Sequence, residues 1–244
     1  MPETDEAAVE RETSAPAGAG DIRDRLALAL DVDDLVEANR LAKTLRPWFG
    51  VAKVGLELYS AVGPDTIGGL RQLGYEVFVD VKLHDIPNTV GRASRVLGSL
   101  GASYLTLHAH GGVAMLRAGV EGLAEGAAEA GLDPPVALAV TVLTSDPDAP
   151  PHIVPKRLRV GVEAGCGGIV CAADDLREVR ELAPRLVRVV PGIRPAGTES
   201  HDQARTATPR DALDAGADLL VVGRAVTRAD DPAAAAERMV ADLA

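Results

Sequence analysis

The sequence predicts an α/β protein, a (β/α)8 TIM barrel formed by a single domain. Eight short apolar runs recur along the 244 residues, and stretches with helical spacing separate most of them. Near-continuous apolar strands that alternate with helices are typical of a parallel sheet covered by helices, and eight such units fit a closed barrel. A doubly wound open sheet is the alternative, but it usually has fewer strands, and the first turn here lacks its glycine fingerprint.

The eight apolar runs are interpreted as the barrel strands. No break in composition between them marks a second domain, so we expect residues 21–244 to form one barrel. Residues 1–20 carry acids, Pro, Gly and Ala with almost no large apolar side chain, which predicts a disordered tail. The runs cover residues 25–31, 51–58, 77–83, 104–109, 136–143, 168–172, 186–192 and 219–224.

Helical spacing and punctuation mark the segments between the strands. Asp33 or Asp34 can cap the first of them, in which Leu35, Val36, Asn39, Ala42 and Leu45 are expected near one face. The segment IPNTVGRASRVLGSLG has a proline at its start and ends at Gly101, the usual asymmetry of helix ends. The segments ADDLREVRELAP and DPAAAAERMVADL follow the same pattern.

Composition excludes several classes of function. Charged residues make up 25% and hydrophobic residues 47%, as in ordinary soluble proteins. The net charge of −11 argues against nucleic-acid binding, although a locally positive pocket for an anionic ligand remains compatible with it. We expect a cytoplasmic protein, since no apolar run is long enough to span a membrane, no signal peptide opens the chain, and Cys166 and Cys171 suit small buried residues in a reduced compartment.

Polar residues cluster at the ends of the predicted strands, where barrel enzymes carry their chemistry. Any one of these residues has a plain structural explanation, such as a helix cap for Asp31 or a rim position for Lys53, but their convergence on one face favours a site. The five histidines show no metal-ligand spacing, and no nucleophile elbow or Walker motif is present. The strand-end residues are Asp31, Asp80, Lys82, His108, Thr144, Arg194, Gly223 and Arg224, with Lys53 inside the second strand.

Asp80 and Lys82 form the centre of the predicted site. Strand alternation points both side chains to one side and Val79 and Val81 to the other. Burying either charge alone is costly, so the two must pair, and Lys53 is a natural third member. A structural salt-bridge network is the alternative interpretation of this cluster.

The residues after the seventh and eighth strands predict a phosphate site. Loops at this position commonly bind phosphate in barrels, and Arg224 offers a planar fork of donors for a phosphate dianion. The long polar segment RPAGTESHDQARTATP, which includes Arg194, suits closure over a ligand, or it is merely a surface loop.

Six motifs together resemble one enzyme family, the orotidine 5′-phosphate decarboxylases. The decapeptide DVKLHDIPNT is highly specific, and the other motifs stand in the family's order and spacing over about residues 22–240. The length resembles the short monofunctional form, without a fused phosphoribosyltransferase. The motifs are LALD (28–31), AKVG (52–55), DVKLHDIPNT (80–89), VTVLTS (140–145), PGIRP (191–195) and VVGRAVT (221–227).

The resemblance implies removal of CO2 from orotidine 5′-monophosphate to give UMP in pyrimidine synthesis, with no cofactor and no metal. By motif position, Lys82 would protonate C6 of the pyrimidine. Asp80 would face the departing carboxylate, and Lys53 would bridge Asp80 and the ribose. The family also implies a homodimer with shared active sites, in which Asp85 and Thr89 would reach the neighbouring subunit's site.

The same resemblance assigns the remaining ligand contacts. Asp31 would hold the ribose, Thr144 the base, and Arg194, Gln203, Gly223 and Arg224 the phosphate end. His110 and His201 depart from the family's pattern, standing where a small residue and an acid are expected. Two rival functions stay open: a metal-dependent sugar-phosphate decarboxylase or epimerase on a related barrel, and a non-catalytic nucleotide-phosphate binder.

Overall fold

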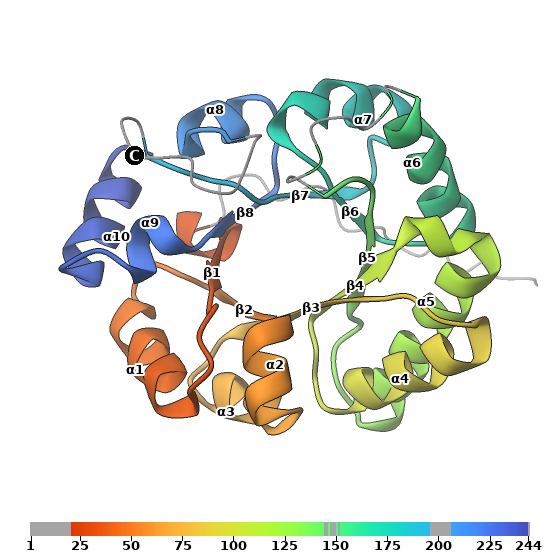
Figure 1. Cartoon of the computed structure of the whole chain (residues 1–244), viewed down its shortest axis with the longest axis horizontal. Helices are drawn as coiled ribbons and strands as arrows, with labels where there is room; N and C mark the ends of the chain where they lie inside the picture. Colours follow the sequence, from red (N-terminus) through yellow and green to blue (C-terminus); the bar gives the residue numbers. More distant parts are fainter. Residues whose placement is uncertain (1–20, 144–145, 147–149, 151, 196–205, 244) are drawn as a thin grey trace, which may run out of the picture.

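Eight parallel strands close into a barrel in sequence order, β1 to β8, with helices around the outside (Figure 1). The computed structural model describes residues 21–143, 146, 150, 152–195 and 206–243, so the predicted tail of residues 1–20 lies outside the described residues. The predicted (β/α)8 barrel is confirmed. The strands are β1 (Leu26–Ala29), β2 (Val51–Gly55), β3 (Glu76–Leu83), β4 (Tyr104–His108), β5 (Val136–Val140), β6 (Gly168–Val170), β7 (Val187–Val190) and β8 (Leu219–Val222).

Helices connect the strands on the outer side, as right-handed βαβ crossovers require. Among the described residues, none of them is long and apolar enough to cross a membrane. The helices are α1 (Leu35–Leu45), α2 (Leu56–Val62), α3 (Asp65–Gln72), α4 (Pro87–Ser99), α5 (Gly112–Glu129), α6 (Ile153–Ala164), α7 (Leu176–Leu182), α8 (Pro209–Asp214), α9 (Arg224–Thr227) and α10 (Pro232–Ala241), with the 3-10 turns η1 (Ile22–Arg25), η2 (Ala109–Gly111) and η3 (Ala173–Asp175).

The predicted helix signals occur where expected, with one correction. The Asp34 carboxylate accepts the Val36 N–H at 2.9 Å and caps α1, and Pro87 opens α4. The expected apolar face of α1 is wrong at its start, because Leu35 and Val36 are 39% and 76% exposed. At 3.6 residues per turn Val36 shares a face with Arg40 and Lys43, whereas the buried stripe is Ala38, Leu41, Ala42 and Leu45.

The core has two parts, one between sheet and helices and a smaller one inside the barrel. Val51 and Phe78 belong to the inner cluster, and Phe78 packs edge-on against Tyr104 with ring centroids 6.0 Å apart. Side chains two residues apart on a strand share a face, so Lys53 follows Val51, and Asp80 follows Phe78, toward the upper end of the barrel interior. The apolar floor of the barrel thus places both charged groups at its mouth.

The two cysteines pack as small core residues. Cys166 and Cys171 are both buried, and neither forms a disulfide. Burial raises the pKa of the Cys166 thiol to about 12, so this group is neutral at physiological pH. The sequence-based interpretation of both residues is confirmed.

Candidate active site

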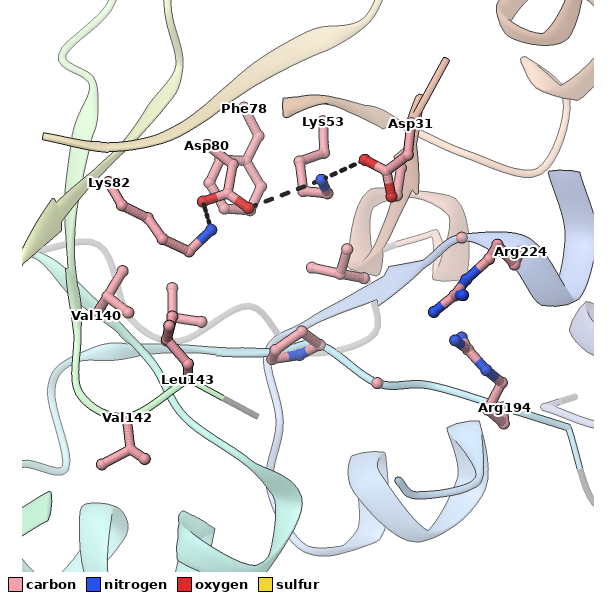
Figure 2. A pocket seen from close by; sticks show the side chains of 16 residues that line it. Asp31, Lys53, Phe78, Asp80, Lys82, Val140, Val142, Leu143, Arg194 and Arg224 are labelled. Atoms are coloured by element: carbon pink, nitrogen blue, oxygen red, sulfur yellow. Dashed lines mark hydrogen bonds and ion pairs between the residues drawn. The ribbon is translucent and has the colours of Figure 1, made fainter. Parts of the chain in front are cut away.

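A cavity of about 230 Å3 opens at the carboxyl ends of the strands (Figure 2). Charged groups line two parts of it, and apolar side chains, which include Phe78, Val140 and Val170, line the rest. Such a mixture suits a ligand with a flat apolar part and a charged part. The lining residues are Ala29, Asp31, Lys53, Phe78, Asp80, Lys82, Val140, Val142, Leu143, Val170, Pro191, Gly192, Arg194, Val221, Gly223 and Arg224.

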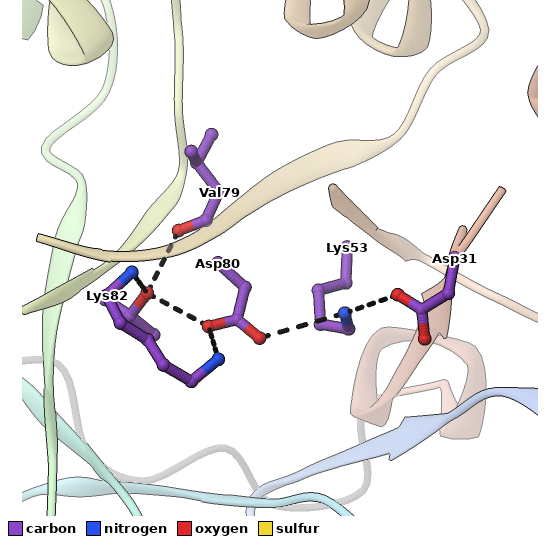
Figure 3. A network of polar contacts seen from close by, with 6 residues as sticks. Asp31, Lys53, Val79, Asp80 and Lys82 are labelled. Atoms are coloured by element: carbon purple, nitrogen blue, oxygen red, sulfur yellow. Dashed lines mark hydrogen bonds and ion pairs between the residues drawn. The ribbon is translucent and has the colours of Figure 1, made fainter. Parts of the chain in front are cut away.

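Four side chains of alternating charge run along the cavity wall (Figure 3). The Lys53 ammonium lies 3.0 Å from Oδ1 of Asp31 and 3.7 Å from Oδ2 of Asp80. The Lys82 ammonium lies 2.8 Å from Oδ1 of Asp80. The order is therefore Asp31, Lys53, Asp80, Lys82, and each interior member has an opposite charge on both sides. The predicted pairing of Asp80, Lys82 and Lys53 is confirmed, and Asp31 extends it.

Burial in this chain of charges is graded. The side chains of Lys53 and Asp80 are 9% and 15% exposed, while those of Lys82 and Asp31 are 31% and 49% exposed. Gly55, at the end of β2, leaves room for the buried lysine: a Cβ there would lie 3.0 Å from Asp31 Oδ1 and 3.2 Å from Lys53 Nζ. A side chain at position 55 would require both charged atoms to shift by a few tenths of an ångström.

The pKa of Asp80 reports how strongly the lysines act. Burial alone would raise it, but the charges of Lys53 and Lys82, together with hydrogen bonds from Lys82 and Thr106, more than offset the burial. The pKa of Asp80 therefore lies below its ordinary value. Asp80 is therefore a carboxylate at neutral pH, and its negative charge lies between the two lysine ammonium groups.

The backbone of β3 is irregular where Lys82 stands. Val79 pairs with Leu105, and Leu83 pairs with Leu107. Between these two pairs β3 therefore has three residues where β4 has one. Lys82 has φ of 48°, the one positive φ among described non-glycine residues. Alternation correctly placed Asp80 and Lys82 on one side, but a bulge and not a regular strand brings the two groups together.

Two guanidinium groups converge at the other end of the cavity. Arg194 follows β7 and Arg224 begins α9 after β8, and their side chains point toward each other in Figure 2. Gly223 lies beside them as the residue before α9. Like charges brought together in this way are typical of an anion site. Thr144, Gln203 and His201 lie outside the described residues.

Asp85 and Thr89 lie away from this cavity. Both residues are exposed, and the Asp85 carboxylate accepts the Ile86 N–H at 2.6 Å. Neither contributes to the wall formed by its own chain. They stand at the start of α4, directly after the strand that carries Asp80 and Lys82.

Sequence reasoning missed a group of three histidines. The rings of His84 and His108 stack at 5.4 Å, and His110 meets them edge-on at 5.6 and 6.2 Å. Burial, together with the positive charge of Arg157, lowers the pKa of His108. Among the described residues, no group of three or more His, Cys, Asp or Glu could hold a metal ion.

Sequence reasoning also missed the apolar wall and Thr106. Phe78, Val140 and Val170 line the cavity, but the sequence pattern identified them only as core residues. Inward register in a barrel strand was the available signal for them. Thr106 could have been found only from the contact between β4 and the bulge of β3.

The fold and the site together define a barrel enzyme with a lysine–carboxylate centre at the mouth of the barrel. Residues 24–239 match the protein family described as "Orotidine 5′-phosphate decarboxylase / HUMPS family". The chain belongs to this family.

Curated relatives and a solved structure agree with this assignment. The chain is 46% identical over 231 residues to "Orotidine 5′-phosphate decarboxylase" of Anaeromyxobacter dehalogenans, covering 90% of this chain and 98% of the relative. It is 42% identical over 239 residues to the protein of the same name from Moorella thermoacetica, covering 91% and 92%. The crystal structure of orotidine 5′-phosphate decarboxylase from Lactobacillus acidophilus superimposes with a TM-score of 0.76 at 34% identity, covering 90% of this chain and 99% of that one.

Proposed function

We propose that this protein decarboxylates orotidine 5′-monophosphate to UMP and CO2, with Lys82 as the acid that serves C6 of the pyrimidine. The observation that carries the proposal is the position of the Lys82 ammonium, 2.8 Å from Asp80 at the cavity wall, in a chain that belongs to this family. The roles of the other site residues are assigned from the order of the charged groups along the cavity.

The reaction breaks the bond between C6 and the substrate carboxylate. CO2 leaves, and the electron pair stays on C6 in an sp2 orbital that the ring delocalises poorly. A fixed ammonium beside C6 stabilises this charge electrostatically and then donates a proton, which gives UMP. The protons balance without a further acid, because the neutral Lys82 amine takes a proton from solvent and returns to its charged form.

Asp80 and Lys53 prepare Lys82 for this step. Asp80 is ionised and contacts both amines, so its charge holds the Lys82 ammonium at the cavity wall before substrate binds. Its carboxylate would face the substrate carboxylate, which raises the energy of the bound substrate relative to the state in which CO2 has left. Lys53 would bridge Asp80 and the ribose, with Asp31 on its other side.

The arginine end of the cavity would bind the phosphate. Arg194 and Arg224 converge there, and Gly223 and Gln203 would complete the contacts. Thr144 would contact the base. Binding energy from the phosphate, far from the reacting carbon, can be used to position C6 against Lys82.

A second copy of the chain would complete each site. Asp85 and Thr89 are exposed and do not line their own cavity, which fits a role across a dimer interface. Asp85 would then supply a second carboxylate to Lys82, giving an array of Lys53, Asp80, Lys82 and the neighbour's Asp85. The active form would be a homodimer with shared sites.

The decisive experiment measures UMP formation from orotidine 5′-monophosphate in the presence of EDTA. We expect turnover that is unchanged by the chelator, followed both by loss of the orotate-ring absorbance and by chromatography of UMP. A metal-dependent sugar-phosphate decarboxylase or epimerase would lose activity with EDTA and would produce no UMP. A non-catalytic nucleotide binder would retain the ligand without forming product, and either result would overturn the proposal.

A further inference from the structure

Thr106 on β4 is fully buried and touches both central residues of the site. Its Oγ1 accepts the backbone N–H of Lys82 at 2.9 Å and lies 3.0 Å from Oδ1 of Asp80. Thr106 does not line the cavity, so it has no direct access to a ligand there.

The contact with Lys82 compensates for the bulge in β3. Between Val79 and Leu83 the regular ladder with β4 is interrupted. The interruption removes the Lys82 N–H from its regular partner, and a buried N–H without a partner is strongly disfavoured. The Thr106 hydroxyl accepts a hydrogen bond from this N–H and so holds Lys82 in its left-handed conformation. A non-glycine residue adopts that conformation only when the surrounding structure imposes it.

The contact with Asp80 fixes the orientation of the carboxylate. A hydroxyl has one proton to donate, and Asp80 Oδ1 at 3.0 Å is a better acceptor than the Val79 carbonyl at 3.5 Å. Oδ1 therefore receives the Thr106 hydroxyl and the Lys82 ammonium together. Oδ2 is left facing Lys53. One hydroxyl thus fixes both the backbone conformation of Lys82 and the orientation of the carboxylate that contacts the Lys82 side chain.

We propose that Thr106 is a positioning residue, which places the Lys82 ammonium and the Asp80 carboxylate for catalysis by joining the bulge of β3 to β4. The inference rests on the proposed decarboxylase function. Misplacement of a reacting group by about 1 Å can cost on the order of 100-fold in rate. Loss of the Thr106 hydroxyl should therefore lower kcat while leaving KM nearly unchanged, since the groups at the phosphate end stay in place.

Three variants of the full-length chain test this proposal. Thr106→Val keeps the shape of the side chain and removes the hydroxyl, whereas Thr106→Ser keeps the hydroxyl and removes the methyl group. Thr141→Val, directly after β5, is the matched control, because Thr141 is equally buried and its hydroxyl donates to the Val170 carbonyl at 3.0 Å and not to Asp80 or Lys82. When the hydroxyl is removed, the Val170 carbonyl still accepts a hydrogen bond from the Thr141 N–H.

We expect Thr106→Val to lose about 10- to 100-fold in kcat, with KM within about threefold of the parent protein. Thr106→Ser should recover most of kcat, and Thr141→Val should resemble the parent protein. The acid limb of the kcat profile should move to higher pH in Thr106→Val, because Asp80 loses a hydrogen bond that lowers its pKa. A merely structural role would lower the melting temperature without moving this limb.

Each outcome decides between the proposals. Equal kcat in Thr106→Val and Thr141→Val would overturn the positioning role while leaving the decarboxylase function intact. A parent protein without UMP formation would instead overturn the proposed function itself. Should Thr106→Val fail to fold, Thr106→Ser keeps the test open: a kcat as low as that of Lys82→Ala in the folded serine variant would also contradict a role for the hydroxyl.

Discussion

The Nζ atom of Lys82 lies 2.8 Å from Oδ1 of Asp80, and the lysine reaches that position through a left-handed backbone within a bulge. Strained residues of this kind persist where the surrounding structure requires them, and they concentrate at functional sites. The pair stands in a chain of four alternating charges at the mouth of a closed barrel.

Replacement of Lys82 by alanine should abolish nearly all turnover. The ammonium both stabilises the developing charge at C6 and supplies the proton, contributions that each reach about 10²-fold or more. Steady-state assays should show kcat lowered at least about 10³-fold, while circular dichroism shows an unchanged fold. Lys43→Ala, an exposed lysine on α1, is the control and should be fully active. Substantial UMP formation by Lys82→Ala would remove Lys82 from the role of acid.

Replacement of Arg224 by alanine should mainly raise KM. Hydrogen bonds to a charged group contribute about 1.5–3 kcal/mol, which corresponds to roughly 10- to 100-fold weaker binding of the phosphate end. Arg228→Ala is a close control, because Arg228 is exposed one turn later and does not line the cavity. A KM equal to that of the parent protein would exclude Arg224 from phosphate binding.

Asp80 should make stability depend on pH in the acid range. Its pKa is lowered in the folded protein, so its contribution is fully present above the ordinary value of about 4 and is lost as pH falls through the lowered value. The free energies of unfolding of the parent protein and Asp80→Asn in urea should therefore differ most above about pH 5 and approach each other as the pH falls below about 4. Asp33→Asn, at an exposed carboxylate before α1, is the control for removal of one acidic charge. A difference that stays constant with pH would contradict the lowered pKa.

Subunit mixing tests the sharing of active sites. Lys82→Ala and Asp85→Asn should each be nearly inactive alone. If Asp85 serves the neighbouring site, a mixed dimer contains one intact site, so random mixing should recover about a quarter of the parent activity. Lys82→Ala mixed with Asp80→Asn is the control, since both residues serve the site of their own chain and no intact site can form. Equal recovery in the two mixtures, or none in the first, would argue against a shared site.

The sequence by itself determined the barrel, the order of its strands and most of the charged residues at its mouth. These follow from local patterns: apolar runs of strand length, helix punctuation, and alternation that carries Val51 to Lys53 and Phe78 to Asp80 toward the interior. The start of α1 shows the limit of such patterns, because Val36 is apolar and yet exposed.

Only the tertiary structure decided how the site is held together. The bulge in β3, the hydroxyl of Thr106 across from it, the approach of Arg194 to Arg224 and the stacking of His84 on His108 join residues that are distant in sequence or out of regular register. Periodicity describes which face a side chain takes on a regular element. It carries no information about where that regularity is interrupted, because the interruption is set by the neighbouring strand with which the chain must form its hydrogen bonds.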